Sequence, residues 1–399
     1  MAREWGTALR VPALVVLACA LAAGGRHASG GELKADLPAT FAPRGITFGH
    51  LTVFPALGYD LTYTDNSTRS QRDTKQDVLL ECTPSFDVRF RPNEHVTSSL
   101  SYEFGWHEYA KETAKHYLSH KAGGEVRIAN LWLEGLSVSL SDAYLQTGNT
   151  SALENQVLAF TRYHTNQSVA KTQYEFSRFT VSGKYTYAFT DYFARVDELS
   201  EFSTHSGEVE GAYRFVPDRF TLFGSCNFTR TLDTHTNVGD FDSQTLLTGV
   251  RGTYSKLSYS VGVGYGFAQY LHQPMEDSGP CFDASLSYAP HRRLAVAVVA
   301  SRHFVAAVQT GVSTDTNVRA TLSILLTERG KMIFDYVRNE SVYQAGYDQV
   351  SVAYSPSFEY KLARFAVATV GYARTERRVS TGTGEFTINE GHVGFRLAW

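Results

Sequence analysis

Apolar and polar residues alternate along most of this chain from about residue 47 onward. At the C-terminus, Val393, Phe395, Leu397 and Trp399 are apolar, and the residues between them are small or polar. A period of two places the apolar side chains on one face of a β-strand and the other side chains on the opposite face. Residues 391–399 are therefore predicted to form a strand with one apolar face that ends on a large aromatic residue.

The same alternation recurs in many segments. Apolar residues occupy almost every second position in the segments 78–90, 96–106, 209–215, 259–267 and 350–360. Turn sequences rich in Pro, Asn and Asp separate some of these segments, for example Arg-Pro-Asn-Glu at 91–94 and Val-Pro-Asp-Arg at 216–219. From there the turns recur about every 33 to 39 residues, which indicates a repeated pair of long strands.

Connections between the predicted strands alternate between short turns and longer polar segments. A propeller blade has a similar repeat length, but it contains four short strands and not two long ones. Short turns on one side and longer loops on the other are typical of a transmembrane antiparallel β-barrel. An ordinary soluble all-β protein is the weaker alternative. The longer segments are residues 66–76, 108–121, 146–156, 197–206, 231–243, 269–279, 309–316, 340–349 and 376–385.

These segments predict an all-β fold, a transmembrane antiparallel barrel of about 18 strands. Sixteen strands are the fallback, because residues 146–185 are the least regular part of the pattern. Residues 294–300 are apolar on both faces, and residues 365–372 nearly so. Either apolar side chains plug the lumen at these strands or the strand boundaries are shifted by one residue.

Composition agrees with many strands and tight turns. The chain has 23 Tyr, 25 Phe and 32 Gly but only 11 Pro, and charged residues make up 19%. A net charge of −3 gives no basic surface for nucleic acid. After residue 23 no run of 18 apolar residues predicts a transmembrane helix. Cys82, Cys226 and Cys281 form no metal motif or disulfide framework, and the first two lie within predicted strands as small apolar residues.

The N-terminal segment has the features of an export signal. Arg3 and Arg10 precede an apolar run at 11–23, so residues 1–28 are predicted to be a signal peptide. Lipidation at Cys19 remains an alternative, since residues 16–19 weakly resemble a lipobox. Residues 29–46 are predicted to be a short periplasmic linker, and residues 47–399 form the predicted barrel.

Charged residues within the strands are assigned by the alternation to the face opposite the apolar one. Water or opposite charges can solvate them there, whereas an outward Arg at mid-membrane costs about 2–4 kcal/mol. They either line a pore or pair as internal salt bridges. Glu125, Asp283 and Asp335 share this assignment with the predicted pore-lining residues, which are Glu81, Asp87, Arg89, Glu103, Arg127, Lys184, Glu208, Glu210, Arg214, Arg251, Arg319, Glu359 and Arg396.

Catalytic and metal-binding motifs are weak in this sequence. No Gly-x-Ser-x-Gly, His-Glu-x-x-His or P-loop motif occurs, and the Ser-x-x-Lys of Ser168 and Lys171 lacks its companion motifs. Asp60, Asp65 and Asp73 match no calcium loop. We expect no enzymatic activity and no cofactor. The candidate metal ligands near one loop, for which a polar loop is the better interpretation, are His107, Glu108, Glu112, His116 and His120.

Two segments resemble known outer-membrane proteins. The predicted first strand ends in Tyr-x-Asp-Asn at 63–66, and this element resembles the putative β-barrel porin 2 family. Members are often associated with exopolysaccharide-export loci. The terminal strand resembles the insertion signal that the bacterial barrel-assembly machinery reads, with Val393, Phe395, Leu397 and Trp399 as its apolar positions. The resemblance implies location in the bacterial outer membrane, contact with its lipid, and polysaccharide-export components as partners.

Two functional hypotheses follow. The first is a porin-like channel that passes small hydrophilic solutes or a secreted polysaccharide. Because inward charges of both signs nearly balance, weak ion selectivity is expected. The second is a non-conducting scaffold or adhesion barrel whose loops bind surface polymer or partner proteins. An outer-membrane hydrolase is the least supported alternative.

Overall fold

The computed structural model describes residues 44–399 except 70–73, 132, 154–155, 194–200, 234–239, 273–275, 308–310, 344–345 and 382–383. The predicted signal peptide and most of the predicted linker, including Cys19, lie outside these residues. The first strand begins at Ile46, next to the predicted start of the barrel at residue 47.

The described residues form strands and one short 3-10 helix, η1 (Thr113–Lys115). None of the helical structure described is long and apolar enough to cross a membrane. The strands are β1 (Ile46–Phe48), β2 (Leu51–Thr64), β3 (Asp77–Phe90), β4 (Val96–Tyr109), β5 (Tyr117–Ala129), β6 (Leu136–Leu153), β7 (Gln156–Phe176), β8 (Phe179–Tyr192), β9 (Phe202–Val216), β10 (Phe220–Asp233), β11 (Phe241–Tyr254), β12 (Leu257–Tyr270), β13 (Glu276–His291), β14 (Leu294–Ala307), β15 (Gly311–Leu325), β16 (Gly330–Tyr343), β17 (Asp348–Ala363), β18 (Ala366–Val379) and β19 (Phe386–Ala398).

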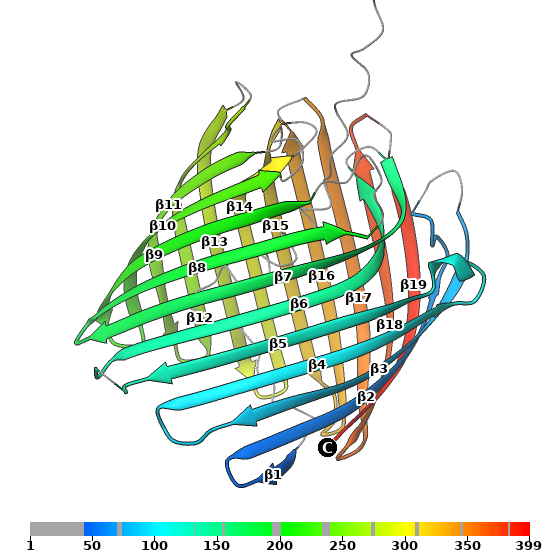
Figure 1. Cartoon of the computed structure of the whole chain (residues 1–399), viewed down its shortest axis with the longest axis horizontal. Coiled ribbons are helices and arrows are strands. Elements are labelled where there is room, and N and C mark those ends of the chain that lie inside the picture. Colours follow the sequence, from blue (N-terminus) through cyan, green and yellow to red (C-terminus); the bar gives the residue numbers. More distant parts are fainter. Residues whose placement is uncertain are drawn as a thin grey trace, which may run out of the picture.

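Strands β2 to β19 form a closed antiparallel barrel of 18 strands (Figure 1). Each strand pairs with its neighbours in sequence, and β19 closes the ring by pairing with β2 from Ala398↔Ala56 to Glu390↔Thr64. The short β1 pairs with the first residues of β2. Closure pairs the first and last barrel strands with each other, as a β-structure that spans a membrane requires. The prediction of an 18-strand barrel is confirmed.

The two ends of the barrel differ as the sequence predicted, with short turns at one end and longer connections at the other. Two predicted loops are wrong. Most of the predicted loop 309–316 belongs to β15, which begins at Gly311. Residues 146–156 were expected to form a polar loop, but β6 continues to Leu153 and β7 begins at Gln156. Thr147 pairs with Tyr163 and Thr150 with Phe160 in this extension. Polar residues that favour strands, such as Thr, extend the wall without the apolar alternation that marks the membrane-spanning part.

The alternating pattern separates an outward face from an inward face. Leu61, Leu100, Val209 and Val263 lie on one face and are 49%, 52%, 61% and 56% exposed, so this apolar face is the outer, lipid-facing one. Contacts between side chains of non-adjacent strands occur on the other face. One such contact joins Arg251 of β11 to the strand two positions away. Such contacts across an intervening strand require the concave inner side.

The C-terminal apolar positions lie on the outer face of β19. Val393, Phe395 and Trp399 are 59%, 37% and 47% exposed, and Leu397 belongs to the same face by alternation. The Trp399 ring stacks on that of Phe365 with centroids 6.3 Å apart. The closing strand therefore presents a continuous apolar row to the lipid.

The strand cysteines are not buried small residues, contrary to the sequence interpretation. Cys226 is exposed and Cys82 is half-buried. Both follow the outward positions of their strands, since Cys226 pairs with the outward Val209. Only Cys281, among the described cysteines, is buried, and it lies on the inner face.

Candidate functional site: the inner wall

The strand register places every predicted pore-lining residue on the inner face. Each lies at an inward position of its strand and alternates with outward apolar residues. Their role in lining a pore stays a prediction, but their neighbours divide them into two groups. The residues are Glu81, Asp87, Arg89, Glu103, Arg127, Lys184, Glu208, Glu210, Arg214, Arg251, Arg319, Glu359 and Arg396.

Charges on β7 to β11 form a series of ion pairs. The guanidinium of Arg251 donates two hydrogen bonds, of 3.0 and 2.8 Å, to Glu210 across β10. Glu210 is only 5% exposed, so this pair is shielded from water. Arg214 lies 2.6 Å from Glu175 of β7. A bidentate guanidinium–carboxylate pair fixes both side chains in position.

The pairing continues through the neighbouring strands. Lys184 Nζ lies 3.8 Å from Glu208. Further round the wall, His303 Nε2 lies 2.8 Å from Asp283 Oδ1, and Arg319 lies 3.6 Å from Asp335. We call the inner wall of β7–β16, with these pairs and those of Arg214 and Arg251, the paired arc. In the paired arc, ion pairs between oppositely charged side chains keep both partners close to the inner wall.

The inner wall of β17–β19 and β2–β5, which we call the open arc, differs. Glu81 contacts His107 at 2.6 Å. Among the described residues, no ion pair within 4.0 Å involves the other predicted charges of this arc. Arg89 instead lies over the Phe54 ring, 4.6 Å from its centroid. These seven charges, four carboxylates and three guanidinium groups, are Asp87, Arg89, Glu103, Glu125, Arg127, Glu359 and Arg396.

A small polar hollow of about 190 Å³ lies in the open arc. Asp60, Glu103 and Arg396 border it, together with Thr and Ser hydroxyls. Glycine keeps it open: a Cβ on Gly394 would stand 2.2 Å from Asp60 Oδ1, and one on Gly58 would stand 2.4 Å from a threonine oxygen. The hollow thus combines carboxylates, a guanidinium and hydroxyls on one patch of wall.

The upper part of β14 leaves the wall and folds inward. Pairing between β13 and β14 ends at Phe282↔Arg302, although β12 and β13 remain paired beyond this level. Above that point Phe304 crosses to the inner side of β12, where a Cβ on Gly266 would stand 2.8 Å from its ring. It packs against inward residues of β11 and β12, including Tyr270. This fold narrows the lumen from the side of the paired arc.

The apolar segment 294–300 forms the regular, wall-forming part of β14. Its strand boundaries are not shifted, because β14 runs from Leu294 and pairs in register with β15. The inward Ala295 is 0% exposed, and its partner Ser323 is 4% exposed. The inward side of β14 is therefore covered at Ala295, near the short turn, whereas the inward Val299 is 39% exposed.

The candidate catalytic pair does not form. Ser168 lies on the outer face of β7, where it donates a hydrogen bond to Asp142. Lys171 is three residues away in the same strand, so it points to the opposite face. The two side chains are separated by the barrel wall.

The candidate metal ligands are also separated. His107 points inward, whereas the outward His120 lies 2.9 Å from the Tyr102 hydroxyl. In the loop, Glu112 contacts Lys115 and lies 3.6 Å from Lys75. Burial alone would raise the pKa of Glu112, but hydrogen bonds from Lys115 and Ser67 hold this pKa below its usual value. Within the described part of the chain, no three His, Cys, Asp or Glu residues are grouped to bind a metal.

The proposed calcium ligands do not converge either. Asp60 points into the lumen, whereas Asp65 accepts hydrogen bonds of 2.8 and 2.6 Å from the backbone and side chain of Asn389. Asp73 lies outside the described residues. The contact of Asp65 joins the loop that follows the first barrel strand to the closing strand, so its role in the structure is to secure the seam.

The sequence that forms this barrel matches a known family. Residues 38–399 match the family described as Putative beta-barrel porin 2. The chain belongs to this family. It is therefore an outer-membrane β-barrel of a porin-like family, as the resemblance of the first strand predicted. None of the curated proteins compared matches the chain significantly.

Several solved outer-membrane structures are similar in fold at low sequence identity. OmpT, an outer-membrane protein of Vibrio cholerae, is 14% identical with a TM-score of 0.42, covering 89% of this chain and 100% of that one. OccAB4 of Acinetobacter baumannii is 9% identical with a TM-score of 0.48, covering 87% and 98%. The FrpB iron transporter of Neisseria meningitidis is 8% identical with a TM-score of 0.49, covering 83% and 63%.

Proposed function

We propose that this protein is a passive outer-membrane channel for small hydrophilic solutes. The observation that carries the proposal is the open arc, where charged side chains of both signs lie on the inner face and have no ion-pair partner within 4.0 Å among the residues that the structure describes. Such groups are stable only where water solvates them. A barrel of this strand number is wide enough for an aqueous channel unless a segment fills it.

The hollow beside Asp60 supports an uncharged, hydroxyl-rich permeant. Carboxylates accept hydrogen bonds from hydroxyl groups, and the guanidinium of Arg396 donates them. Among the described residues, the predicted open-arc charges without ion-pair partners are four carboxylates and three guanidinium groups, and this near balance gives no strong preference for either ion. A sugar, or a polysaccharide chain moving through the lumen, is therefore a better match than a strongly charged solute.

Liposome swelling tests this proposal directly. Proteoliposomes placed in isotonic sugars of increasing size should swell quickly in monosaccharides and more slowly in trisaccharides. Liposomes that contain the same amount of heat-denatured protein are the control. Absence of swelling in every sugar would contradict the channel.

A second candidate is a closed scaffold barrel, and the inward fold of β14 favours it. Phe304 and the ion pairs of the paired arc fill part of the lumen. A lumen closed in this way would leave the barrel stable and impermeable. Swelling assays separate the two candidates, since the scaffold predicts none in any sugar.

A further inference from the structure

Polar side chains interrupt the apolar outer face on β6 and β7. Asp142 lies on this face, in line with Leu140. It accepts hydrogen bonds from Asn166 Nδ2 at 3.0 Å and from Ser168 Oγ at 2.5 Å. A carboxylate has about four acceptor positions, so these two bonds leave acceptor capacity on the surface. Lipid hydrocarbon supplies no donor for it.

Asp142 also lies deep in the membrane. It is six residues inside the strand from Leu136, the residue at which β6 leaves the short turn. Membrane strands cross the hydrocarbon region in about 9–11 residues, so this position is near the middle. Ionisable groups at that depth are rare and are normally covered by protein. A neighbouring protein is therefore needed to supply hydrogen-bond donors to the Asp142 carboxylate.

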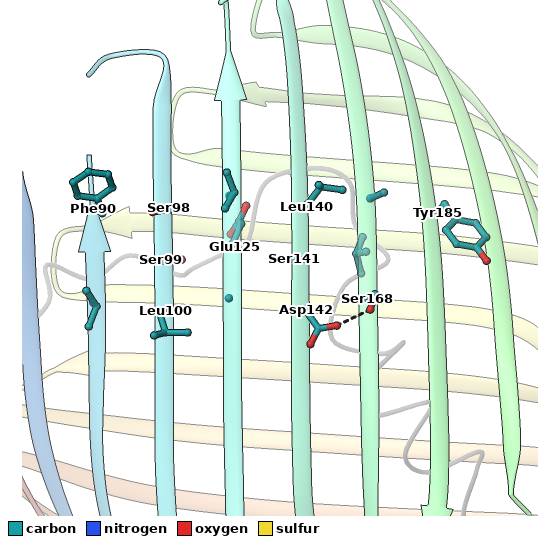
Figure 2. A pocket seen from close by; sticks show the side chains of 15 residues that line it. Phe90, Ser98, Ser99, Leu100, Glu125, Leu140, Ser141, Asp142, Ser168 and Tyr185 are labelled. Atoms are coloured by element: carbon teal, nitrogen blue, oxygen red, sulfur yellow. Dashed lines mark hydrogen bonds between the residues drawn. The ribbon is translucent and has the colours of Figure 1, made fainter. Parts of the chain in front are cut away.

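A shallow hollow of about 580 Å³ surrounds this carboxylate on the outer surface (Figure 2). Small residues line part of it, among them Gly124, Ser168 and Ala170. Large side chains also line it: Leu140, 60% exposed, lies near its middle, and Tyr185, 49% exposed, lies at one side (Figure 2). A hollow beside protruding side chains is a surface that can interlock with another surface of the same shape.

Asp142 on β6 and Tyr185 on β8 lie on either side of β7 at the same depth in the membrane. Asp142, Ala170 and Tyr185 are each six residues from the short-turn end of β6, β7 and β8, respectively. Two copies inserted in the same direction are related by an axis along the membrane normal, which preserves depth. A two-fold axis at Ala170 therefore brings Asp142 of each copy to Tyr185 of the other.

The hydrogen-bond chemistry of this contact is also complementary. The Tyr185 hydroxyl lies 2.7 Å from Nδ1 of His205. When that nitrogen donates, the hydroxyl hydrogen of Tyr185 is available to an acceptor. In the two-fold arrangement the acceptor is the free side of Asp142 in the second copy. Each copy then supplies one donor and one acceptor, as an isologous interface requires.

We propose that two copies of this chain form a dimer in the membrane through the outer faces of β6–β8, with Ala170 at the two-fold axis. The match between Asp142 and Tyr185 at one depth selects a second copy over an unrelated partner. The small residues of the hollow allow the two walls to approach closely, as small residues do between membrane helices. The proposal is independent of conduction, because the contact lies outside the lumen.

Disulfide trapping in native outer membranes tests the position of the axis. Ala170→Cys should give a disulfide-linked dimer as the main species after mild oxidation. The wild-type chain contains a matched control: Cys226 faces outward on β10, also six residues from its strand end at Phe220. It is three strands from β7, or roughly 14 Å along the wall at about 4.8 Å per strand. Wild-type protein should therefore remain monomeric on the gel.

Failure of Ala170→Cys to cross-link above the wild-type level would overturn the proposed axis. Equal cross-linking through Cys226 in the wild-type protein would overturn it as well, because both thiols cannot lie at one two-fold axis. Either result would leave a lipid or another protein as the occupant of the hollow.

A second measurement tests the role of the carboxylate. Asp142→Leu gives the outer face an ordinary apolar residue, so the barrel should fold normally while dimerisation weakens at least tenfold in native mass spectrometry from detergent. Thr248→Leu is the matched control, since Thr248 is outward and exposed on β11, six residues from Tyr254. An unchanged dimer in Asp142→Leu, or equal loss in both variants, would overturn the interface.

Discussion

The paired arc and the open arc share the alternation of inward and outward residues, but their inward charged side chains differ in their contacts. In the paired arc, Arg251 and Glu210 bind each other across an intervening strand and are largely shielded from water. In the open arc, Arg89 and Glu103 share a wall but have no ion pair within 4.0 Å among the described residues. Ion pairs therefore connect the strands of the paired arc, whereas the charged side chains of the open arc face the lumen.

The comparison shows where inward charged side chains form ion pairs that connect strands. A pair forms where opposite charges lie at one level on strands one or two apart, as Lys184 and Glu208 do in the register of β8 and β9. Shielding from water then raises the cost of breaking the pair. The open arc shows that this condition is not sufficient: the register places Glu103 opposite Lys121 and Glu359 opposite Lys331, but no ion pair within 4.0 Å joins either couple among the described residues. These charged side chains must be hydrated, and a hydrated wall is the basis of a channel.

The largest expected effect is on the closure that holds both arcs in one ring. Phe395→Asp places a charge on the outer face of β19, and deletion of Trp399 shortens the apolar row that this strand presents. Either change should lower the outer-membrane level about tenfold, because β19 pairs with β2 to complete the barrel. The measurement is the amount of heat-modifiable protein in membrane fractions.

Arg396→Gln is the matched control for closure, since Arg396 lies on the same strand but faces inward. It should leave the membrane level unchanged. A normal level of the Phe395→Asp protein would show that the terminal strand is not the insertion signal.

The next effect is on stability and separates the two arcs. Arg251→Ala removes the two guanidinium hydrogen bonds to the buried Glu210, which should lower the free energy of unfolding by about 3 kcal/mol. Arg89→Ala in the open arc should change it by less than about 1 kcal/mol. Urea unfolding in detergent or lipid measures both. Equal losses in the two variants would mean that the arcs do not differ energetically.

A smaller effect is expected on conductance from the inward-folded segment. Phe304→Ala removes the ring that packs against Tyr270 and the glycine-rich inner face of β12. Loosening this contact should widen the narrowest part of the lumen. Because that part limits the ion current, single-channel conductance should rise by about a third to twofold. Phe54→Ala, on the open arc, is a control of equal size change. A greater increase in the control would place the constriction elsewhere.

The smallest effect is on ion selectivity. Replacing Arg89, Arg127 and Arg396 together with Gln removes unpaired positive charges from the open arc, so reversal potentials should shift modestly toward cations. Arg214 and Arg251 are less suitable for this test because both are engaged in ion pairs. The double variant Glu210→Gln with Arg251→Gln is the neutral control. Unchanged selectivity in the triple variant would mean that these arginines do not face the permeation path.

The sequence predicted the fold well because its evidence is local. Alternation at Val393, Phe395 and Leu397 identifies the face of a strand without knowledge of any other strand. The same parity placed Arg251 and Arg89 on the inner face. The extension of β6 and β7 could not be predicted in this way, because Thr147 and Thr150 lie where the apolar alternation has ended.

The division into two arcs depends on register and was not visible in the sequence. Glu210 and Arg251 are separated by 41 residues, and only the pairing of β9, β10 and β11 brings them together. The inward turn of β14 likewise follows from a pairing that stops at Phe282↔Arg302. The outward Asp142 was also missed, although its place among alternating apolar residues could have revealed it.

The central claim is that the open arc borders a water-filled lumen, and planar-bilayer recording of the purified wild-type protein tests it most directly. Heat-modifiable gel mobility should first show that the protein is folded. The account predicts stepwise insertion of channels with a conductance that is linear in salt concentration and nearly equal for small cations and anions. Folded protein that inserts into the bilayer without any conductance steps would contradict it.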